Sequence, residues 1–189
     1  MLEKESAMGR QITTAIAKIQ DALIRLSATT PVQELSVAAL CREAGVSRSS
    51  FYLHYSHIKE VYDDVVVRMM DDVQLFHDRA GCRECMSTDK AAFCDFIRNN
   101  AEWRGIFTDR YFISTWVGLA LARPDYDYLA MLKRRGLTKR QAEILYTFHM
   151  SGCYAVALSP FAKDADFDQQ RRLLDKFIRA GHDAVCSHA

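Results

Sequence analysis

Helix-breaking residues are scarce in this chain: of its 189 residues, three are proline and eight are glycine. No apolar run approaches the roughly 18 residues that a membrane-spanning helix needs, and the N-terminus carries no apolar signal-peptide core. These absences predict long helices and a cytoplasmic protein that does not contact a membrane. Six cysteines in a chain without an export signal are expected to be reduced thiols, not a disulfide framework.

Positive charge is not in excess either. The net charge is +1, and residues 1–60 hold seven lysines and arginines against six aspartates and glutamates. Nucleic-acid-binding proteins usually present a broad basic face. A DNA-binding role here would therefore depend on a few well-placed cations, hydroxyl groups and helix N-termini. The apolar share of 49% and the charged share of 26% are ordinary for a soluble globular protein.

The chain also lacks the sequence motifs of common enzyme classes. It contains no phosphate-binding glycine loop, no H-E-x-x-H pair of histidines, no nucleophile elbow and no convincing pair of carboxylates. We therefore expect that the protein is not an enzyme and that it needs no cofactor.

One pair of cysteines, Cys82 and Cys85, has the C-x-x-C spacing of half a metal site or of a redox pair. A zinc site would require two further ligands, and His77, Asp78 and Cys94 are merely close in sequence. Incidental loop cysteines are the preferred interpretation, so no metal is predicted. Under the other interpretation, oxidation or metal binding would tune the adjacent segment.

Apolar residues recur at helical spacing along most of the chain, and no segment alternates in the manner of a half-buried strand. The sequence therefore predicts an all-α fold. A loop is expected over residues 80–88, followed by helical periodicity that Asn99, Asn100 and Gly105 interrupt. The longer predicted helices span residues 11–27, 57–78, 111–122, 126–134, 138–158 and 168–186.

The stretch SVAALCREAGVSRSSFYLHY, residues 36–55, predicts two short helices around a tight turn. Ser36 and Ser47 are placed to cap these helices, and Gly45 supplies the left-handed backbone of the turn. Phe51 is expected to point inward. The residues expected to point outward are Arg48, Ser49, Ser50, Tyr52 and His54. This pattern indicates a helix-turn-helix whose second helix enters a DNA major groove.

This segment resembles the DNA-binding segment of the tetracycline-repressor (TetR) family, in which an A-x-x-A-G-V-S-x-x-[ST]-[FL]-Y run is usual. The matching residues are 41–47 and 50–52, within a similar order of helices over about residues 10–76. The resemblance implies a three-helix DNA-binding head at residues 1–56. A long helix would join it to a helical effector-binding and dimerisation domain at residues 57–189.

The resemblance also implies which residues contact DNA. Ser36 and Ser47 would offer hydroxyl or amide groups to phosphates, and Tyr52 and His54 would reach phosphate oxygens. Arg48 would either read guanine in the groove or clamp a phosphate. The full predicted DNA-binding set is Ser36, Ser47, Arg48, Ser49, Ser50, Tyr52, His54 and Lys59.

Two positions depart from the family pattern. Ser49 stands where glycine is common, which adds bulk near the groove together with a hydrogen-bond donor. Ile58 stands where a phosphate-binding lysine commonly opens the next helix. Either Lys59 or His57 could take over that contact, although Lys59 lies about 100° further around the helix.

Aromatic residues concentrate between residues 103 and 154, where members of the family usually hold a small-molecule pocket. The resemblance implies that an unknown small-molecule effector is bound by Trp103, Phe107, Tyr111, Phe112, Trp116, Phe148, His149 and Tyr154. Taken singly, an aromatic residue at helical spacing more often fills the core, and a histidine on an apolar face is more often a core residue than a ligand.

The last two predicted helices suit a two-fold dimer. The first of them carries small residues that permit close approach, namely Gly152, Cys153, Ala155 and Ala157. The second carries a complementary stripe formed by Leu173, Phe177 and Gly181. Two such helices from each subunit would form a four-helix interface, with DNA half-sites about one helical turn apart. The alternative is that these helices pack only within one chain.

The expected function is a ligand-responsive transcriptional regulator, most simply a repressor, that binds a palindromic DNA operator as a homodimer. An effector among the C-terminal helices would favour a different spacing of the two heads, and it must bind the two states with different affinity. The alternative is a helical scaffold that binds another protein and no DNA.

Overall fold

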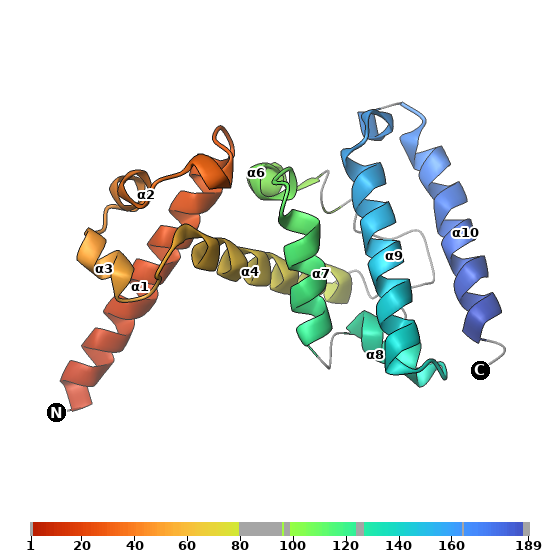
Figure 1. Cartoon of the computed structure of the whole chain (residues 1–189), viewed down its shortest axis with the longest axis horizontal. Helices are drawn as coiled ribbons and strands as arrows, with labels where there is room; N and C mark the ends of the chain where they lie inside the picture. The colour runs from red at the N-terminus through yellow and green to blue at the C-terminus, as the bar shows by residue number, and fades with distance from the viewer. Residues whose placement is uncertain (1, 80–95, 97–98, 124–126, 164, 187–189) are drawn as a thin grey trace. The chain divides into compact units, whose positions relative to one another are not determined.

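The structure of the chain is a computed structural model that describes residues 2–79, 96, 99–123, 127–163 and 165–186. Within these residues the secondary structure is helical and contains no strand, so the predicted all-α class is confirmed (Figure 1). The predicted loop at 80–88, with Cys82 and Cys85, lies outside the described residues. Among the described helices, none combines the length and the apolar character needed to span a bilayer.

The helices agree with the predicted ones to within a few residues, except at the N-terminus. The first helix begins at Leu2 and not at Gln11. The prediction started too late because residues 2–10 lack the apolar stripe, but they contain no proline, so the helix can continue through them. The α-helices are α1 (Leu2–Ser27), α2 (Val37–Ala44), α3 (Arg48–Tyr52), α4 (Ile58–Arg79), α6 (Arg104–Phe107), α7 (Phe112–Ala122), α8 (Asp127–Arg134), α9 (Lys139–Leu158) and α10 (Phe167–Cys186). The short 3-10 helices are η1 (Val32–Glu34), η2 (Ala101–Trp103) and η3 (Pro160–Lys163).

The chain packs as two compact units. The first unit contains Met1–Met69 and Asn100–Phe112, and the second contains Met70–Asn99 and Ile113–Ala189. The helix α4 contributes its first part to one unit and its last part to the other. The predicted boundary between residues 56 and 57 is a division by functional role, and it stays a prediction.

The core of the first unit is centred on α1, against which α2 and α3 pack. Two surface ion pairs tie neighbouring helices to α1. Arg25 Nε lies 2.6 Å from Glu43 Oε1 of α2, and Arg68 Nη1 of α4 lies 2.7 Å from Asp21 Oδ1. The fully buried side chains of this core include Ile19, Leu23, Leu40, Phe51, Val61 and Met69.

The helix α6 approaches the C-terminal end of α1 very closely. A Cβ atom at Gly105 would lie 2.1 Å from the backbone oxygen of Ser27, so only glycine fits there. The Ser27 side chain is buried, and its hydroxyl donates to the carbonyl of Ile24 at 2.9 Å. The prediction that Gly105 interrupts a helix is therefore wrong. The residue lies inside α6, where the missing side chain lets two backbones touch.

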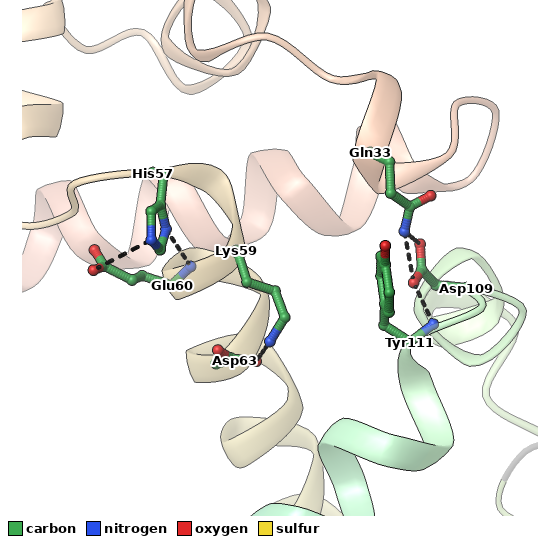
Figure 2. Close-up of polar contacts among 7 residues, drawn as sticks. All are labelled: Gln33, His57, Lys59, Glu60, Asp63, Asp109 and Tyr111. Carbon is green, nitrogen blue, oxygen red and sulfur yellow. Dashed lines mark hydrogen bonds and ion pairs between the residues drawn. The ribbon is translucent and has the colours of Figure 1, made fainter.

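A buried carboxylate joins two distant parts of the first unit (Figure 2). Asp109, in the turn after α6, is buried, and its two oxygens accept hydrogen bonds from Gln33 Nε2 at 3.0 and 2.8 Å. The backbone N–H of Tyr111 donates to the same carboxylate at 2.9 Å. Because Gln33 belongs to η1, shortly before α2, these bonds tie residues 100–112 to the segment that leads into α2.

The second unit contains α7, α8, α9 and α10 around a core of large side chains. The helices α9 and α10 run side by side in opposite directions (Figure 1), and the ring centroids of His149 and His182 lie 5.7 Å apart between them. Thr138 begins α9 through a capping box with Gln141, within a residue of the predicted start of this helix. Buried side chains of this unit include Trp116, Leu129, Leu132, Ala142, Tyr146 and Met150.

Candidate nucleic-acid interface

The helices α2 and α3 are joined by a tight turn, and both predicted caps are confirmed. The Ser36 hydroxyl accepts a hydrogen bond from the Ala39 N–H at 3.1 Å, and the Ser47 hydroxyl accepts one from the Ser50 N–H at 3.0 Å. Such caps stabilise a helix by about 1 kcal/mol each. Gly45 has a φ of 65°, a left-handed conformation that glycine adopts without steric cost.

The helix α3 is anchored on one side and exposed on the other. Phe51 is fully buried beneath it, and the Phe51 ring meets the Tyr52 ring edge to face, with centroids 5.3 Å apart. Arg48 and Tyr52 are both exposed and stand four residues apart, so they share one face of the helix. Burial raises the pKa of the Cys41 thiol in α2, and the nearby charge of Arg48 opposes this rise.

Two exposed side chains of α3 and the half-buried His54 in the turn after it have polar groups that the described part of the chain does not engage. The Arg48 guanidinium, the Tyr52 hydroxyl and the His54 ring form no hydrogen bond or ion pair with any described residue. The hydroxyls of Ser47 and Ser49, by contrast, lie 3.1 Å apart and bond to each other. A cation, a phenol and an imidazole are therefore available to a partner outside the chain.

The end of α3 is positioned by the buried side chain of Tyr55. Its hydroxyl donates to Asp64 Oδ2 of α4 at 2.9 Å and accepts from Gln20 Nε2 of α1 at 3.2 Å. Burial is the main reason that the pKa of Tyr55 rises to about 12, and the carboxylates of Asp64 and Glu60 add to this rise. One tyrosine thus connects α1 and α4 to the segment that follows α3.

Both residues predicted to replace the usual lysine contact neighbours on α4, as Figure 2 shows. Lys59 donates to Asp63 one turn along the helix, and its Nζ lies 5.8 Å from the Tyr62 ring centroid. His57 Nδ1 accepts from the Glu60 N–H at 3.3 Å and so caps α4. An exposed ion pair of the Lys59 type is worth only about 0.3–0.5 kcal/mol, so a phosphate can replace Asp63. Lys59 is therefore the better candidate for the phosphate contact that a lysine commonly makes at the position of Ile58.

Local charge on α2 and α3 is positive despite the neutral composition of residues 1–60. Glu43 is the single acidic residue of the two helices, and Arg25 already neutralises it. Arg42 and Arg48 are exposed and form no ion pair with the described residues. No known protein-family model matches the chain. A functional conclusion therefore has to rest on this geometry and on the sequence pattern.

The predicted effector-binding residues are divided between the two units. The first unit holds Trp103, Phe107, Tyr111 and Phe112, and the second holds Trp116, Phe148, His149 and Tyr154. Phe107 and Phe112 pack edge to face with centroids 5.4 Å apart, and both are core residues of the first unit. Phe148 is 71% exposed on α9. The effector site itself stays a prediction.

Sequence reasoning missed the polar centre of the second unit. The Tyr128 hydroxyl lies 2.6 Å from Nδ1 of His149 and 3.0 Å from Nε2 of His182, so hydrogen bonds join α8, α9 and α10. Burial, with a smaller contribution from the other ring, lowers the pKa of His149 to about 4. Burial also lowers the pKa of His182, and Arg135 adds to that effect. The sequence contains no signal for a buried role of His182, because this histidine belongs to no motif and lies in a helix rich in charged residues.

Acidification is expected to destabilise the second unit through His149. Its folded-state pKa is about 4 and the ordinary histidine value is 6.5, so the unfolded chain binds more protons between these values. This stabilisation is complete above about pH 6.5 and is lost as the pH falls toward 4, by on the order of 3 kcal/mol. Urea unfolding of a Trp103→Phe protein, followed by the fluorescence of Trp116, measures the loss.

The matching variant for this experiment is His149→Gln, which keeps a polar side chain that does not titrate. Its unfolding free energy should fall less steeply than the parent's between pH 6.5 and pH 4, the window set by the two pKa values. Equal slopes in the two proteins would show that His149 is not held neutral by the fold.

Proposed function

We propose that the chain is a ligand-responsive regulator of transcription that binds a palindromic DNA operator as a homodimer, most simply as a repressor. The observation that carries this proposal is the outer face of α3 and the turn that follows it, where Arg48, Tyr52 and the half-buried His54 have polar groups that no described residue engages. The resemblance of residues 36–55 to the DNA-binding segment of TetR-family proteins supports the same function. In this proposal residues 1–56 form the DNA-binding head, and the chain is not an enzyme.

In the proposed complex, the first residues of α3 enter the major groove. Arg48 is the candidate for paired hydrogen bonds to guanine O6 and N7, which are worth about 1–3 kcal/mol of discrimination. Tyr52, His54 and Lys59 contact phosphates. The hydroxyl oxygen of Ser36 accepts the cap bond of α2, so its own O–H can still donate to a phosphate near that helix end.

Gel shifts with DNA from upstream of the chain's own gene, at two salt concentrations, test this proposal. The parent protein should bind saturably and selectively, and more weakly at the higher salt concentration. Arg48→Ala should weaken binding and relax sequence preference, whereas Tyr52→Ala should weaken binding to every sequence. Arg110→Ala is the matched control, since it removes an exposed cation from the same unit outside α3. Unchanged binding by the α3 variants would overturn the proposal.

The homodimer is proposed to form through α9 and α10. Ile144 and Phe148 stand four residues apart on α9, as do Leu173 and Phe177 on α10, so each helix carries an apolar stripe. Burying one such side chain contributes about 1.5–3 kcal/mol. The large apolar side chains exposed on these helices are Ile144, Phe148, Leu158, Leu173, Phe177 and Val185. Two copies would complete a four-helix interface.

Phe177→Glu is expected to convert the dimer to a monomer, because a charge would be buried in the centre of the interface. Operator binding should weaken with it, since a single head contacts only one half-site. Sedimentation velocity measures the change in mass. Arg172→Glu is the control, because this exposed residue lies on α10 outside the stripe. A dimeric Phe177→Glu protein would assign the interface to another surface.

The effector is proposed to act from the second unit by favouring a different spacing of the two heads. The predicted contacts that lie in this unit are Trp116, Phe148, His149 and Tyr154. A coupling free energy of about 1–3 kcal/mol would change operator affinity roughly 5–150-fold. The effector achieves this only if its affinities for the two states differ.

A helical scaffold that binds another protein is the second candidate, and the exposed stripes of α9 and α10 favour it. Such a protein would use the same apolar residues, including Phe148 and Phe177, for a different chain. The gel shift separates the two candidates, because a scaffold shows no saturable and sequence-selective binding to DNA.

A further inference from the structure

The turn that joins α8 to α9 in the second unit can be followed in Figure 1, and its sequence concentrates positive charge. Five of eight consecutive residues are basic and exposed, and we name them the basic corner: Lys133, Arg134, Arg135, Lys139 and Arg140. The other 20 lysines and arginines of the chain (25 less these five) stand against 24 acidic residues. The basic corner is therefore a local excess in a chain that is otherwise slightly acidic.

Three cations of the basic corner, Arg135, Lys139 and Arg140, form only loose pairs with nearby carboxylates. Asp183 lies 3.5 Å from Arg135, and Glu143 lies 3.8 Å from both Lys139 and Arg140. A strong charge-assisted hydrogen bond is nearer 2.7–2.9 Å, so these are loose surface pairs. The side chains of Lys139 and Arg140 remain 81% and 83% exposed.

Two of these cations oppose the stability of their own helix. Lys139 and Arg140 are the first two residues of α9, at the positive end of the helix dipole. A cation there is unfavourable by about 0.3–1 kcal/mol, whereas the cations in the last turn of α8 are favourable. The loose pairs with Glu143 return no more than about 0.3–0.5 kcal/mol each, so local helix stability gives no net reason for the first-turn cations. Departures from local rules of this kind are expected at functional sites.

The backbone beneath the basic corner is firmly held. The Leu137 N–H donates to the Leu132 carbonyl at 3.3 Å, and the Gly136 N–H donates to the Lys133 carbonyl at 3.0 Å. With Gly136 at a φ of 96°, this is a Schellman motif that ends α8. Leu132 and Leu137 are both buried, and Thr138 opens α9 with its capping box. The cations thus project from a turn whose backbone is held by hydrogen bonds on both sides.

We propose that the basic corner binds the phosphate backbone of double-stranded nucleic acid, as a contact surface separate from α3. A duplex backbone requires only placed cations, which release counterions when they neutralise phosphates. Residues 133–140, which contain the basic corner, include no aromatic residue on which the bases of a single strand could stack. The large apolar residue of this segment, Leu137, is buried, so the segment offers neither an apolar side chain to insert into a bilayer nor an anchor for a protein interface.

The test is a salt titration of duplex binding by the full chain. Arg48→Ala and Tyr52→Ala are first combined to silence α3, and fluorescence anisotropy with a short random-sequence duplex gives the observed affinity K. The corner variant then adds Arg134→Gln, Lys139→Gln and Arg140→Gln. The slope of log K against log salt concentration should shrink by about 0.9 for each lost phosphate contact, or by roughly 2–3 in all.

The matched control replaces three cations of α10 in the same unit, namely Arg172→Gln, Lys176→Gln and Arg179→Gln. It changes the net charge by the same amount and should leave the slope within one contact of the background protein's. Restoring the charge with Arg134→Lys and Arg140→Lys, with Lys139 left in place, should restore the slope. This restoration separates loss of charge from loss of folding.

A corner variant with the same slope as the control would overturn the inference. So would corner-dependent binding to vesicles of phosphatidylserine and phosphatidylcholine in the absence of duplex binding, because the partner would then be a membrane surface. Either outcome is distinct from failure of the proposed operator binding, which is measured on the protein with an intact α3. The inference is tested only by non-specific binding to the random-sequence duplex.

Discussion

Gly105→Ala is expected to lower the free energy of unfolding of the first unit by about 3 kcal/mol or more, the upper end of the cost of overpacking. The new Cβ would lie 2.1 Å from the backbone oxygen of Ser27 and 2.2 Å from its carbonyl carbon. Because these are backbone atoms, no side-chain rotation relieves the contact. The helix α6 would have to move away from α1 and uncover part of the core.

The fluorescence of Trp103 reports this change, because Trp103 is buried in the same unit. The chain has two tryptophans, so in a Trp116→Phe background Trp103 is the single one. Gly118→Ala is the matched control: its Cβ would meet no atom within 4 Å, and it should not lower the stability of either unit. An unchanged urea midpoint for Gly105→Ala would contradict the close approach of α6 and α1.

Phe51→Ala is expected to destabilise the first unit by about 3–5 kcal/mol, the usual range for removing a fully buried phenylalanine. The Phe51 ring lies beneath α3 and contacts the rings of Tyr52 and Tyr55, with centroid distances of 5.3 and 5.9 Å. Its loss leaves a cavity under the five residues of α3. Urea unfolding followed by Trp103 fluorescence measures the effect.

The neighbouring variant Tyr52→Ala separates stability from DNA binding. Tyr52 is 59% exposed, so its removal should cost no more than about 1 kcal/mol, chiefly from the edge-to-face contact with Phe51. Under the proposed function, Tyr52→Ala stays folded and binds DNA poorly, whereas Phe51→Ala binds poorly because α3 is no longer held in place. A folded Tyr52→Ala protein with the DNA affinity of the parent would remove Tyr52 from the interface.

Structural features that depend on residues close together in the sequence could be predicted. Ser36, Ser47 and Thr138 each precede a helix with a hydroxyl in capping position, and Gly45 stands where a turn needs a left-handed residue. Apolar spacing gave the inward direction of Phe51 in the same way. These features depend on local geometry, so a single sequence contains them.

Contacts between distant segments were not readable. The packing of α6 on α1 depends on Gly105 and Ser27, and the bond between Gln33 and Asp109 spans 76 residues. Glycine in a helical pattern ordinarily signals a break, which is why Gly105 was misread. Without an independent contact signal, nothing assigns residues 100–112 to the unit formed by the N-terminal helices.

The polar centre of the second unit was unreadable for a related reason. Tyr128 is one of eight tyrosines in the chain, and His182 lies in a helix rich in charged residues. Only the folding of α8, α9 and α10 together brings the Tyr128 hydroxyl between two imidazoles. The bond between His149 and Tyr128 agrees with the alternative interpretation of His149 as a core residue, and its role in effector binding stays a prediction.

The hydrogen bonds between Gln33 and Asp109 limit how this protein can be cut and recombined. A fragment ending at Met69 would leave the Gln33 amide without its carboxylate partner and would strip α6 from the end of α1. The first unit is thus not an N-terminal cassette. A chimera that grafts it onto a different body must carry residues 100–112 as a second insert, so that Gly105 and Asp109 meet their original neighbours.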